Sequence, residues 1–407
     1  MSAVAAGDAF EDVWRRESPH LLAALLRVRA DLAACEDAAQ EAAEAAVRQW
    51  PRDGTPDDPR AWLIRVAHRR LIDRWRSEAA RTRREEADAR GATAAEVSSA
   101  DDTVDLLLLC AHPALTRSSQ VALALRAVAG LGVERIAAVY LVPPRTMTQR
   151  LTRARATLRD AGATFPVPSG AELPARVAAA LDVCHLMFTA GYTRSSGTDL
   201  LDDELTAEAV RLTRRMVAAF PDHDEAAAAL ALMVLTDARA PARVDARGDL
   251  VPLAEQDRSR WRRDAIAEGV AILEALLPRG HVGTFALQAA IAAVHAEAES
   301  YGDTDWAQIV VLYRMLERIA PSGTVALNHA VAVGMAYGPE AGLALLGRLD
   351  DDHTLRDGHR LPAARAHLYE LAGRPGDAAA AYRTAAARTA SLPEQRYLNR
   401  RLRDLER

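Results

Sequence analysis

The chain has 407 residues and a mass of 43.9 kDa, enough for two or three domains. Hydrophobic residues make up 50% and charged residues 26%, a balance that excludes a wholly disordered chain. The net charge of −5 excludes a uniformly basic protein, but it conceals two basic segments. Residues 60–84 hold nine arginines against two acidic residues, and residues 133–160 hold six against two.

Cysteine usage and hydropathy narrow the class of protein further. Cys35, Cys110 and Cys184 are far apart and form no Cys-x-x-Cys or Cys/His pattern, so we expect neither a disulfide framework nor a metal site. The longest apolar run, residues 226–235, is about half the length that a membrane span requires. The first twenty residues are rich in acids, so we expect no signal peptide. We also expect no membrane segment, no cofactor and a cytoplasmic location.

The first 104 residues predict three helices and a linker. Leucines and alanines at helical spacing predict two helices within residues 10–50. The turn-rich segment from Trp50 to Asp58 predicts a loop. Asp58 is then placed to cap a helix that begins at Pro59 and runs to about Arg76. Residues 77–104 are charged and lack periodicity, which predicts a flexible linker.

The helix that begins at Pro59 is expected to have an apolar face and a basic face. Helical periodicity places in the apolar stripe Ile64, Ala67, Leu71 and Trp75. The opposite face carries Trp62, Arg65, Arg69, Asp73 and Arg76. Guanidinium groups bind phosphates and an aromatic ring stacks on a base, so this face suits a single nucleic-acid strand. The alternative, of equal weight, is a half-buried Trp62 beside solvated arginines.

Residues 131–158 predict a helix-turn-helix. A short helix around Ile136 precedes a turn at residues 140–143, and Pro144 is placed to begin the second helix. The buried stripe of that helix is expected to comprise Met147, Leu151, Ala154 and Leu158. Its exposed face carries Arg145, Thr148, Gln149, Thr152 and Arg153. Arg pairs with guanine and Gln with adenine, so we interpret the second helix as one that reads the major groove. Any two short helices joined by a tight turn share this pattern.

The second expected helix is acidic. Its charged or amide side chains are Glu36, Asp37, Gln40, Glu41 and Glu44. Asp37 and Glu41 are four residues apart and therefore share a face. No histidine, metal-ligand set or phosphate-binding loop accompanies them, so we do not expect catalysis. The pattern fits either a solvated face or a docking surface for a basic partner.

Beyond a boundary rich in proline and glycine at residues 166–174, the chain has helical periodicity to its end. Breaks are predicted near residues 221, 241–252, 278–283, 321 and 338–339. The stretch from Ala366 to Ala385 has the order of small residues, Gly turn and Tyr that is typical of a tetratricopeptide repeat. Chance similarity among alanine-rich helices is the alternative. We therefore predict an all-α fold in which residues 170–407 form a tetratricopeptide-like helical domain.

The order of these motifs resembles the extracytoplasmic-function (ECF) sigma factors of bacterial RNA polymerase. The resemblance rests on E-D-x-x-Q-E in the acidic helix, on P-R-A-W-L-I-R-V-A-H-R-R-L-I-D-R-W-R after it, and on the helix-turn-helix. The tail is similar to the branch of that family with a C-terminal tetratricopeptide-like extension. The tail stretches that carry this similarity are residues 242–261, A-A-I-A-A-V-H-A-E-A, D-T-D-W-A-Q-I-V and L-N-H-A-V-A-V. The resemblance places sigma region 2 at residues 10–76 and sigma region 4 at residues 105–162.

The resemblance implies partners and a role for each face. The residues that match the contact with the clamp helices of the polymerase β′ subunit are Asp37, Gln40 and Glu41. Those that match the contact with the −10 element are Trp62, Arg65, Arg69 and Arg76, with the loop at residues 50–58 receiving a flipped base. Those that match the reading of the −35 element are Arg145, Thr148, Gln149 and Arg153. The implied partners are core RNA polymerase, through β′ and the β flap, promoter DNA, and a regulatory protein or ligand at the C-terminal domain.

Two short motifs depart from that branch of the family. Tyr337 precedes Gly338 and Pro339 where the branch often has Asp, and Cys110 and Ala111 precede His112 where it often has two cysteines. Neither departure touches the expected DNA-binding surfaces.

The competing interpretation is a helix-turn-helix DNA-binding regulator that carries a tetratricopeptide-like scaffold and does not enter polymerase. In that case, replacing Asp37, Gln40 and Glu41 would change nothing. We do not expect an enzyme, because the sequence has no Gly-rich phosphate loop, nucleophile elbow or metal-ligand constellation.

Overall fold

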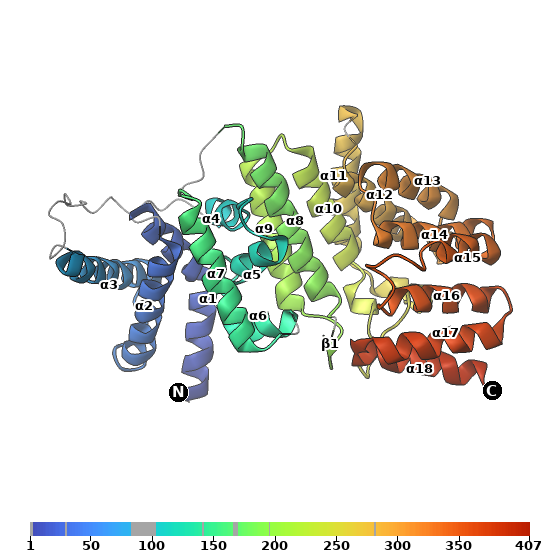
Figure 1. The fold of residues 1–407 in the computed structure, drawn as a ribbon, viewed down its shortest axis with the longest axis horizontal. Coiled ribbons are helices and arrows are strands. Elements are labelled where there is room, and N and C mark those ends of the chain that lie inside the picture. The colour runs from blue at the N-terminus through green and yellow to red at the C-terminus, as the bar shows by residue number, and fades with distance from the viewer. Residues whose placement is uncertain are drawn as a thin grey trace. The chain divides into compact units, whose positions relative to one another are not determined.

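The computed structural model describes residues 3–28, 31–82, 103–140, 142–165, 170–194, 196–280 and 282–407, and these are almost entirely helical (Figure 1). They form two compact units, Met1–Leu186 and Met187–Arg407. Strand structure in the described residues is one parallel pair, β1 (Ser196–Gly197) and β2 (Ala390–Ser391). The all-α prediction is therefore confirmed.

Three helices form an N-terminal bundle in the first unit: α1 (Ala3–Val28), α2 (Leu32–Asp53) and α3 (Pro59–Thr82). Each packs against the other two, around a core that includes Leu21, Leu25, Ala42, Leu63 and Leu71. Asp31 caps α2 by accepting hydrogen bonds from two backbone amides. The Asp58 carboxylate accepts a hydrogen bond of 3.0 Å from the Ala61 amide, which confirms the predicted start of α3.

Two helix boundaries in this bundle differ from the prediction. Residues 50–53 continue α2 instead of beginning the loop, because the buried Trp50 ring packs against Phe10 and Trp62 and offsets the helix-breaking effect of Pro51. Helix α3 continues past Arg76 to Thr82, into the segment expected to be a linker. Of the rest of that segment, residues 83–102 lie outside the described residues, and residues 103–104 begin the next helix.

Four helices follow: α4 (Thr103–Cys110), α5 (Arg117–Ala127), α6 (Val133–Val139) and α7 (Pro144–Asp160). Helix α5 packs against α4, α6 and α7, and α1 of the N-terminal bundle packs against α4. The buried Gln120 side chain joins α5 to the turn before it, donating to the Ala111 carbonyl at 3.2 Å and the His112 carbonyl at 3.0 Å. The first unit therefore holds both basic helices, α3 and α7.

Helix α8 (Leu173–Tyr192) bears on the expectation of no membrane segment. Its length and apolar composition are sufficient to cross a membrane. Only the longest uninterrupted apolar run was considered in the sequence, and this helix was therefore not noticed there. Its two charged residues instead contact earlier helices: the buried Arg176 donates to the Leu108 carbonyl at 3.4 Å, and Asp182 forms an ion pair with Arg117. A helix packed into a protein core meets the same length and composition criteria. The division between the two compact units falls within α8, after Leu186.

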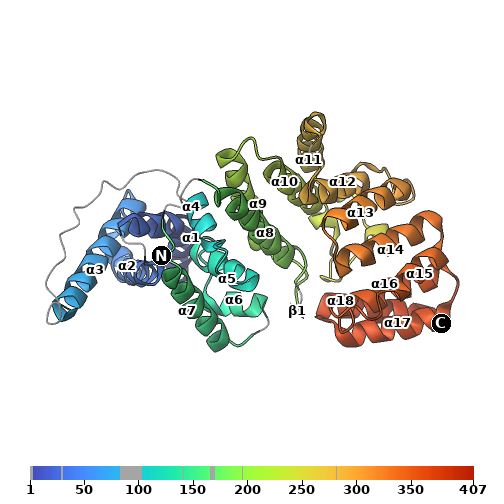
Figure 2. The same ribbon diagram turned by 45° about the horizontal axis from the view of Figure 1, so that its top comes forward.

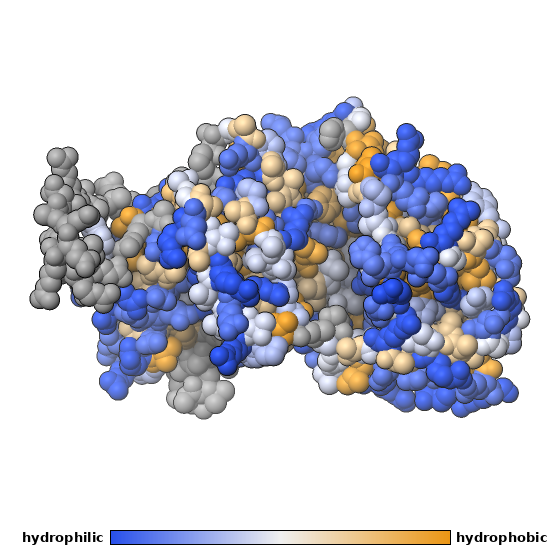
Figure 3. All heavy atoms as spheres, in the orientation of Figure 1, coloured by the Kyte–Doolittle hydropathy of each residue, from blue (hydrophilic) through white to orange (hydrophobic). Residues whose placement is uncertain are grey.

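The second unit contains ten further α-helices among the described residues. They are α9 (Asp203–Ala219), α10 (Asp224–Asp237), α11 (Arg263–Leu276), α12 (Thr284–Glu297), α13 (Trp306–Ile319), α14 (Gly323–Tyr337), α15 (Pro339–Gly347), α16 (Arg360–Leu371), α17 (Pro375–Arg388) and α18 (Leu392–Leu405). From α12 onward each helix packs against the next along the chain (Figure 2), and the core consists of successive clusters. The predicted breaks coincide with the ends of α9, α10, α11, α13 and α14, but the ends of α12 and α15 were not among them. The visible surface over α17 and α18 is mainly hydrophilic (Figure 3), as expected for helices buried along one face.

The connection between α10 and α11 is held in place at several points. It contains three 3₁₀ helices, η1 (Ala240–Ala242), η2 (Leu253–Glu255) and η3 (Arg258–Arg260). The guanidinium of Arg243 donates to the Tyr192 carbonyl and, at 3.1 Å, to the Thr193 hydroxyl. Asp249 forms an ion pair with Arg396 of α18. This contact joins α18 to the connection, and the β1–β2 pair joins the last helices of the unit to its first residues.

Candidate nucleic-acid interface

The predicted polymerase-docking residues lie on one face of α2, and α3 supplies arginines beside them. Asp37 and Gln40 are exposed and Glu41 is half-buried. Arg74 donates to the Asp37 carboxylate at 2.8 Å and pairs with Glu41, while Arg70 Nε lies 3.6 Å from a Glu41 oxygen. The hydrogen bond to Asp37 is the main reason that the pKa of Arg74 is raised. Sequence reasoning missed both arginines, although their i, i+4 spacing matches that of the two acids.

Glu36 was expected among the solvated acidic residues, and that prediction is wrong. Its side chain is only 7% exposed and forms an ion pair with Arg155 of α7, whose side chain is 21% exposed. Burial raises the pKa of the Glu36 carboxyl, and the positive charges of Arg155 and Arg126 oppose that shift. Glu36 therefore belongs to the packing between α2 and α7 and not to the exposed acidic face.

The basic face of α3 is accessible to solvent. Arg65, Arg69 and Arg76 are exposed, and no described carboxylate forms an ion pair with them. Trp62 is half-buried, and its ring lies edge-on to that of Trp50, with 5.5 Å between the centroids. The aromatic ring of Trp62 is thus both part of the packing and partly accessible. Residues 54–58, which connect α2 to α3, are mostly exposed.

The apolar stripe of α3 is largely as predicted. Three of its four expected members are buried: Ile64, Ala67 and Leu71. Trp75 is only half-buried, which corrects its place in the core. Leu63, which the pattern omitted, is fully buried.

Helices α6 and α7 lie where the helix-turn-helix was predicted. Helix α7 begins at Pro144, and its buried residues are Met147, Leu151, Ala154 and Leu158. Its exposed residues include the predicted reading set Arg145, Thr148, Gln149, Thr152 and Arg153. The hydroxyls of Thr148 and Thr152 donate to carbonyls four residues earlier, at 3.1 and 2.9 Å, so both are engaged by the helix itself. Arg145 and Gln149 therefore have the side chains most available for base edges.

Tyr140 fastens the turn before α7 to α5. Its hydroxyl donates to the Ser118 carbonyl at 2.7 Å, and the Arg150 guanidinium lies 5.0 Å from the centre of its ring. Burial raises the pKa of this hydroxyl, so it stays protonated as a donor. These contacts fix the direction in which α7 leaves the turn.

Cys110 and His112 are packing residues. Burial raises the pKa of the Cys110 thiol, and the Nδ1 atom of His112 accepts a hydrogen bond of 3.1 Å from the Ala114 amide. Burial also lowers the pKa of His112. Within the part of the chain that the structure describes, no group of three or more potential metal ligands is found.

Comparison with known proteins finds family matches in two segments of the chain. Residues 13–81 match Sigma-70 region 2, and residues 176–277 match a family of unknown function, DUF6596. An uncharacterised protein of Rhizobium meliloti (strain 1021) is 38% identical over 401 residues, which cover 94% of this chain and 93% of that protein. A crystal structure of a thermophilic TPR protein of Thermus thermophilus shares 18% identity, covering 50% of this chain and 91% of that chain with a TM-score of 0.35.

The Sigma-70 region 2 match falls on the bundle of α1, α2 and α3. This match supports a role for the protein in transcription initiation. The chain belongs to the sigma-70 family and carries a C-terminal extension that includes the DUF6596 region.

Proposed function

We propose that the protein is a cytoplasmic ECF-type sigma factor that binds core RNA polymerase and directs promoter-specific initiation. The C-terminal helices, residues 170–407, modulate that activity in this proposal. The observation that carries it is the pair of exposed basic faces on α3 and α7, which have no ion-pair partners among the described acids and lie in the unit that contains Sigma-70 region 2. Two such faces suit a protein that binds two DNA elements.

Recognition of the −10 element is assigned to the basic face of α3. Its residues are Trp62, Arg65, Arg69 and Arg76, with residues 50–58 near its start. Exposed arginines along one helix follow a phosphate backbone, and a partly accessible indole can stack on an unpaired base. Because Trp50 packs against Trp62, the indole is held in a fixed orientation before DNA arrives.

Recognition of the −35 element is assigned to the exposed face of α7, residues Arg145, Thr148, Gln149 and Arg153. Arg145 and Gln149 are the expected base readers, because the Thr148 hydroxyl is engaged by its own helix. Arg153 lies about two turns beyond Arg145 and is expected to contact phosphate.

Docking on the β′ clamp helices is assigned to Asp37, Gln40 and Glu41. In the free protein Arg74 partly neutralises this face. Exposed ion pairs are worth at most about 1 kcal/mol, so a basic side chain of the polymerase can replace Arg74 at small cost. Contact of the helix-turn-helix domain with the β flap completes the proposed assembly.

Run-off transcription with core RNA polymerase tests the proposal, on the DNA upstream of the protein's own gene. We expect a specific transcript that depends on this protein and is lost in the double variant Asp37→Asn/Gln40→Ala. The control is Glu44→Gln on the same helix, whose side chain is 68% exposed and, among the described residues, forms its ion pair with Arg48. The control should transcribe as the unchanged protein does.

If polymerase does not bind the protein, or if the double variant binds as well as the control, the sigma-factor proposal fails. The helix-turn-helix regulator with a helical scaffold would then be the better account. Retained binding of the protein to double-stranded DNA would support that second account.

A further inference from the structure

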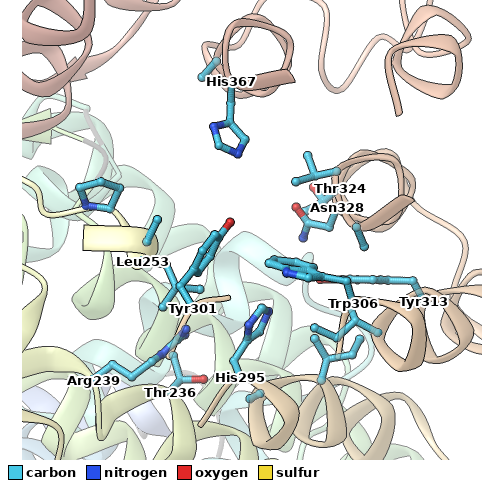
Figure 4. A pocket seen from close by; sticks show the side chains of 18 of the residues that line it. Thr236, Arg239, Leu253, His295, Tyr301, Trp306, Tyr313, Thr324, Asn328 and His367 are labelled. Carbon is cyan, nitrogen blue, oxygen red and sulfur yellow. The ribbon is translucent and has the colours of Figure 1, made fainter. Parts of the chain in front are cut away.

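A cavity of about 630 Å³ lies in the second unit, lined by side chains from α10, α12, α13, α14 and α16 to α18. Figure 4 labels side chains that line it from α10, α12, α13, α14 and α16. Residues 252–255, in the connection between α10 and α11, form part of its wall. Its volume lies within the range of small-molecule sites. The tail stretches singled out in the sequence meet here, since His295, Trp306 and Asn328 all line it although they are far apart in the chain.

One arginine in the cavity wall has no acidic partner. Arg239 follows α10, and its backbone is fixed by hydrogen bonds with Thr236 and Ala242. No described carboxylate forms an ion pair with its half-buried guanidinium. The other arginine of the wall, Arg401, is neutralised, because it pairs with Glu370 and lies 4.0 Å from Glu255.

The two histidines of the wall add no positive charge at neutral pH. Burial, with smaller contributions from the charges of Arg239 and Arg258, lowers the pKa of His295 to about 4. Burial also lowers the pKa of His367. Arg239 is therefore the one cation without a carboxylate partner among the residues that line this cavity.

Aromatic rings form another part of the wall. Trp306 lies edge-to-face with His295, at 5.1 Å between centroids, and with Tyr301, at 5.6 Å. Figure 4 shows these rings and Tyr313 around one space, with Arg239 close to His295 and Tyr301. Trp306 and Tyr301 are half-buried, so they are held by each other and still offer ring surface to a ligand.

We propose that this cavity binds a small molecule that combines an aromatic ring with a single carboxylate. The carboxylate pairs with Arg239, and the ring packs against Trp306 and Tyr301. A single cation without an ion-pair partner suits a monoanion better than a phosphate, which carries more charge and requires more donors. The site belongs to the C-terminal extension, and its ligand binding does not depend on polymerase or DNA.

Isothermal titration calorimetry on the full chain tests this site with two matched probes, 2-naphthoate and its neutral amide. We expect the carboxylate to bind at least about 10-fold more tightly than the amide. Arg239→Gln should abolish that preference, and Arg239→Lys, which keeps the charge, should retain part of it. Trp306→Leu should weaken binding of both probes. The control Arg318→Gln, an exposed arginine on α13 away from the cavity, should change neither.

Three results would overturn the proposal. The first is equal affinity for the two probes, which would indicate apolar association alone. The second is a preference for the carboxylate that survives in Arg239→Gln with unchanged helical content by circular dichroism. The third is no binding of 2-naphthoate at concentrations up to about 10 mM. Because none of these readouts involves transcription, failure here is distinct from failure of the sigma-factor proposal.

Discussion

Removing the cation beside Glu36 is expected to destabilise the first unit strongly. Arg155→Met keeps a long side chain but leaves the Glu36 carboxylate, which is 7% exposed, without its ion-pair partner. Two unit charges 4 Å apart attract by about 4 kcal/mol at an effective dielectric constant of about 20. Breaking a buried pair by removing one partner costs about 3–5 kcal/mol. Since Arg126 remains nearby, we expect a loss of about 3 kcal/mol in the free energy of unfolding.

Two further variants separate the ion pair from general effects of the substitution. Glu36→Leu/Arg155→Met should recover most of the loss, because replacing both members by apolar residues is often nearly neutral. Arg159→Met, a change on the same helix at a side chain that is 60% exposed, should cost less than about 0.5 kcal/mol. Hydrogen exchange at the amides of α2 and α7 is the suitable assay, because a chain with two compact units need not unfold in one step. The reasoning is refuted if Arg155→Met and Arg159→Met behave alike, or if the double variant is no more stable than Arg155→Met.

The pH dependence of Arg155→Met follows from the raised pKa of Glu36. A carboxyl whose pKa is higher in the folded than in the unfolded protein favours folding when protonated. Its contribution is fully present below its ordinary value of 4.5 and is lost as the pH rises through the folded-state value. Without Arg155 that folded-state value rises further, so the deficit of the variant should shrink as the pH falls from about 7 to about 5. Adding Glu36→Gln to Arg155→Met should remove this dependence, and a deficit that stays constant with pH in Arg155→Met would contradict the assignment.

Three further outcomes are expected. Glu225 of α10 caps the neighbouring α12, because its carboxylate accepts hydrogen bonds from the Phe285 amide at 2.9 Å and the Ala286 amide at 3.1 Å. Glu225→Ala should therefore lower the stability of α12 by about 1–2 kcal/mol. Unchanged hydrogen exchange in α12 would argue against this cap. Gly338 has a φ of 103°, so Gly338→Ala should destabilise the protein by about 1 kcal/mol. Gly347 lies in a helix with open space around it, so Gly347→Ala should instead stabilise the protein. Denaturant unfolding that ranks the two variants the other way would contradict this reasoning. All three cysteines are buried, and burial raises the pKa of Cys110. A thiol reagent at mildly alkaline pH should therefore label no cysteine until the chain is denatured. Rapid labelling of the native protein would contradict this expectation, because it would show that a thiol is accessible.

Local sequence patterns predicted the elements that depend on neighbours within a few turns. The buried stripe of α7 follows from the helical period alone, because Met147, Leu151, Ala154 and Leu158 lie on one side of a single helix. The start of α3 follows from an Asp and a Pro in adjacent positions, each of which has a defined role at a helix N-terminus. The exposed arginines of α3 and α7 lie on the opposite faces of the same helices and therefore follow from the same periodicity.

Contacts between distant segments were not available from such patterns. The burial of Glu36 depends on Arg155, more than a hundred residues away, and a carboxylate beside Asp37 in an acidic helix gives no sign of it. The extension of α2 to Asp53 depends on how Trp50 packs, which offsets the local effect of Pro51. Likewise, the cavity is built from helices spread between α10 and α18, none of which encloses a space by itself.

The contacts that join α18 and β2 to earlier parts of the second unit affect how that unit can come apart. In an open array of helices, the last pair has a neighbour on one side only and frays first. Here the last helices also contact the beginning of the unit through β1 and the connection between α10 and α11 through Asp249, so releasing them breaks contacts with earlier parts of the unit as well. A single proteolytic cut in one of the connections between α12 and α18 should therefore leave two fragments that remain associated, because each is still held by the rest of the array.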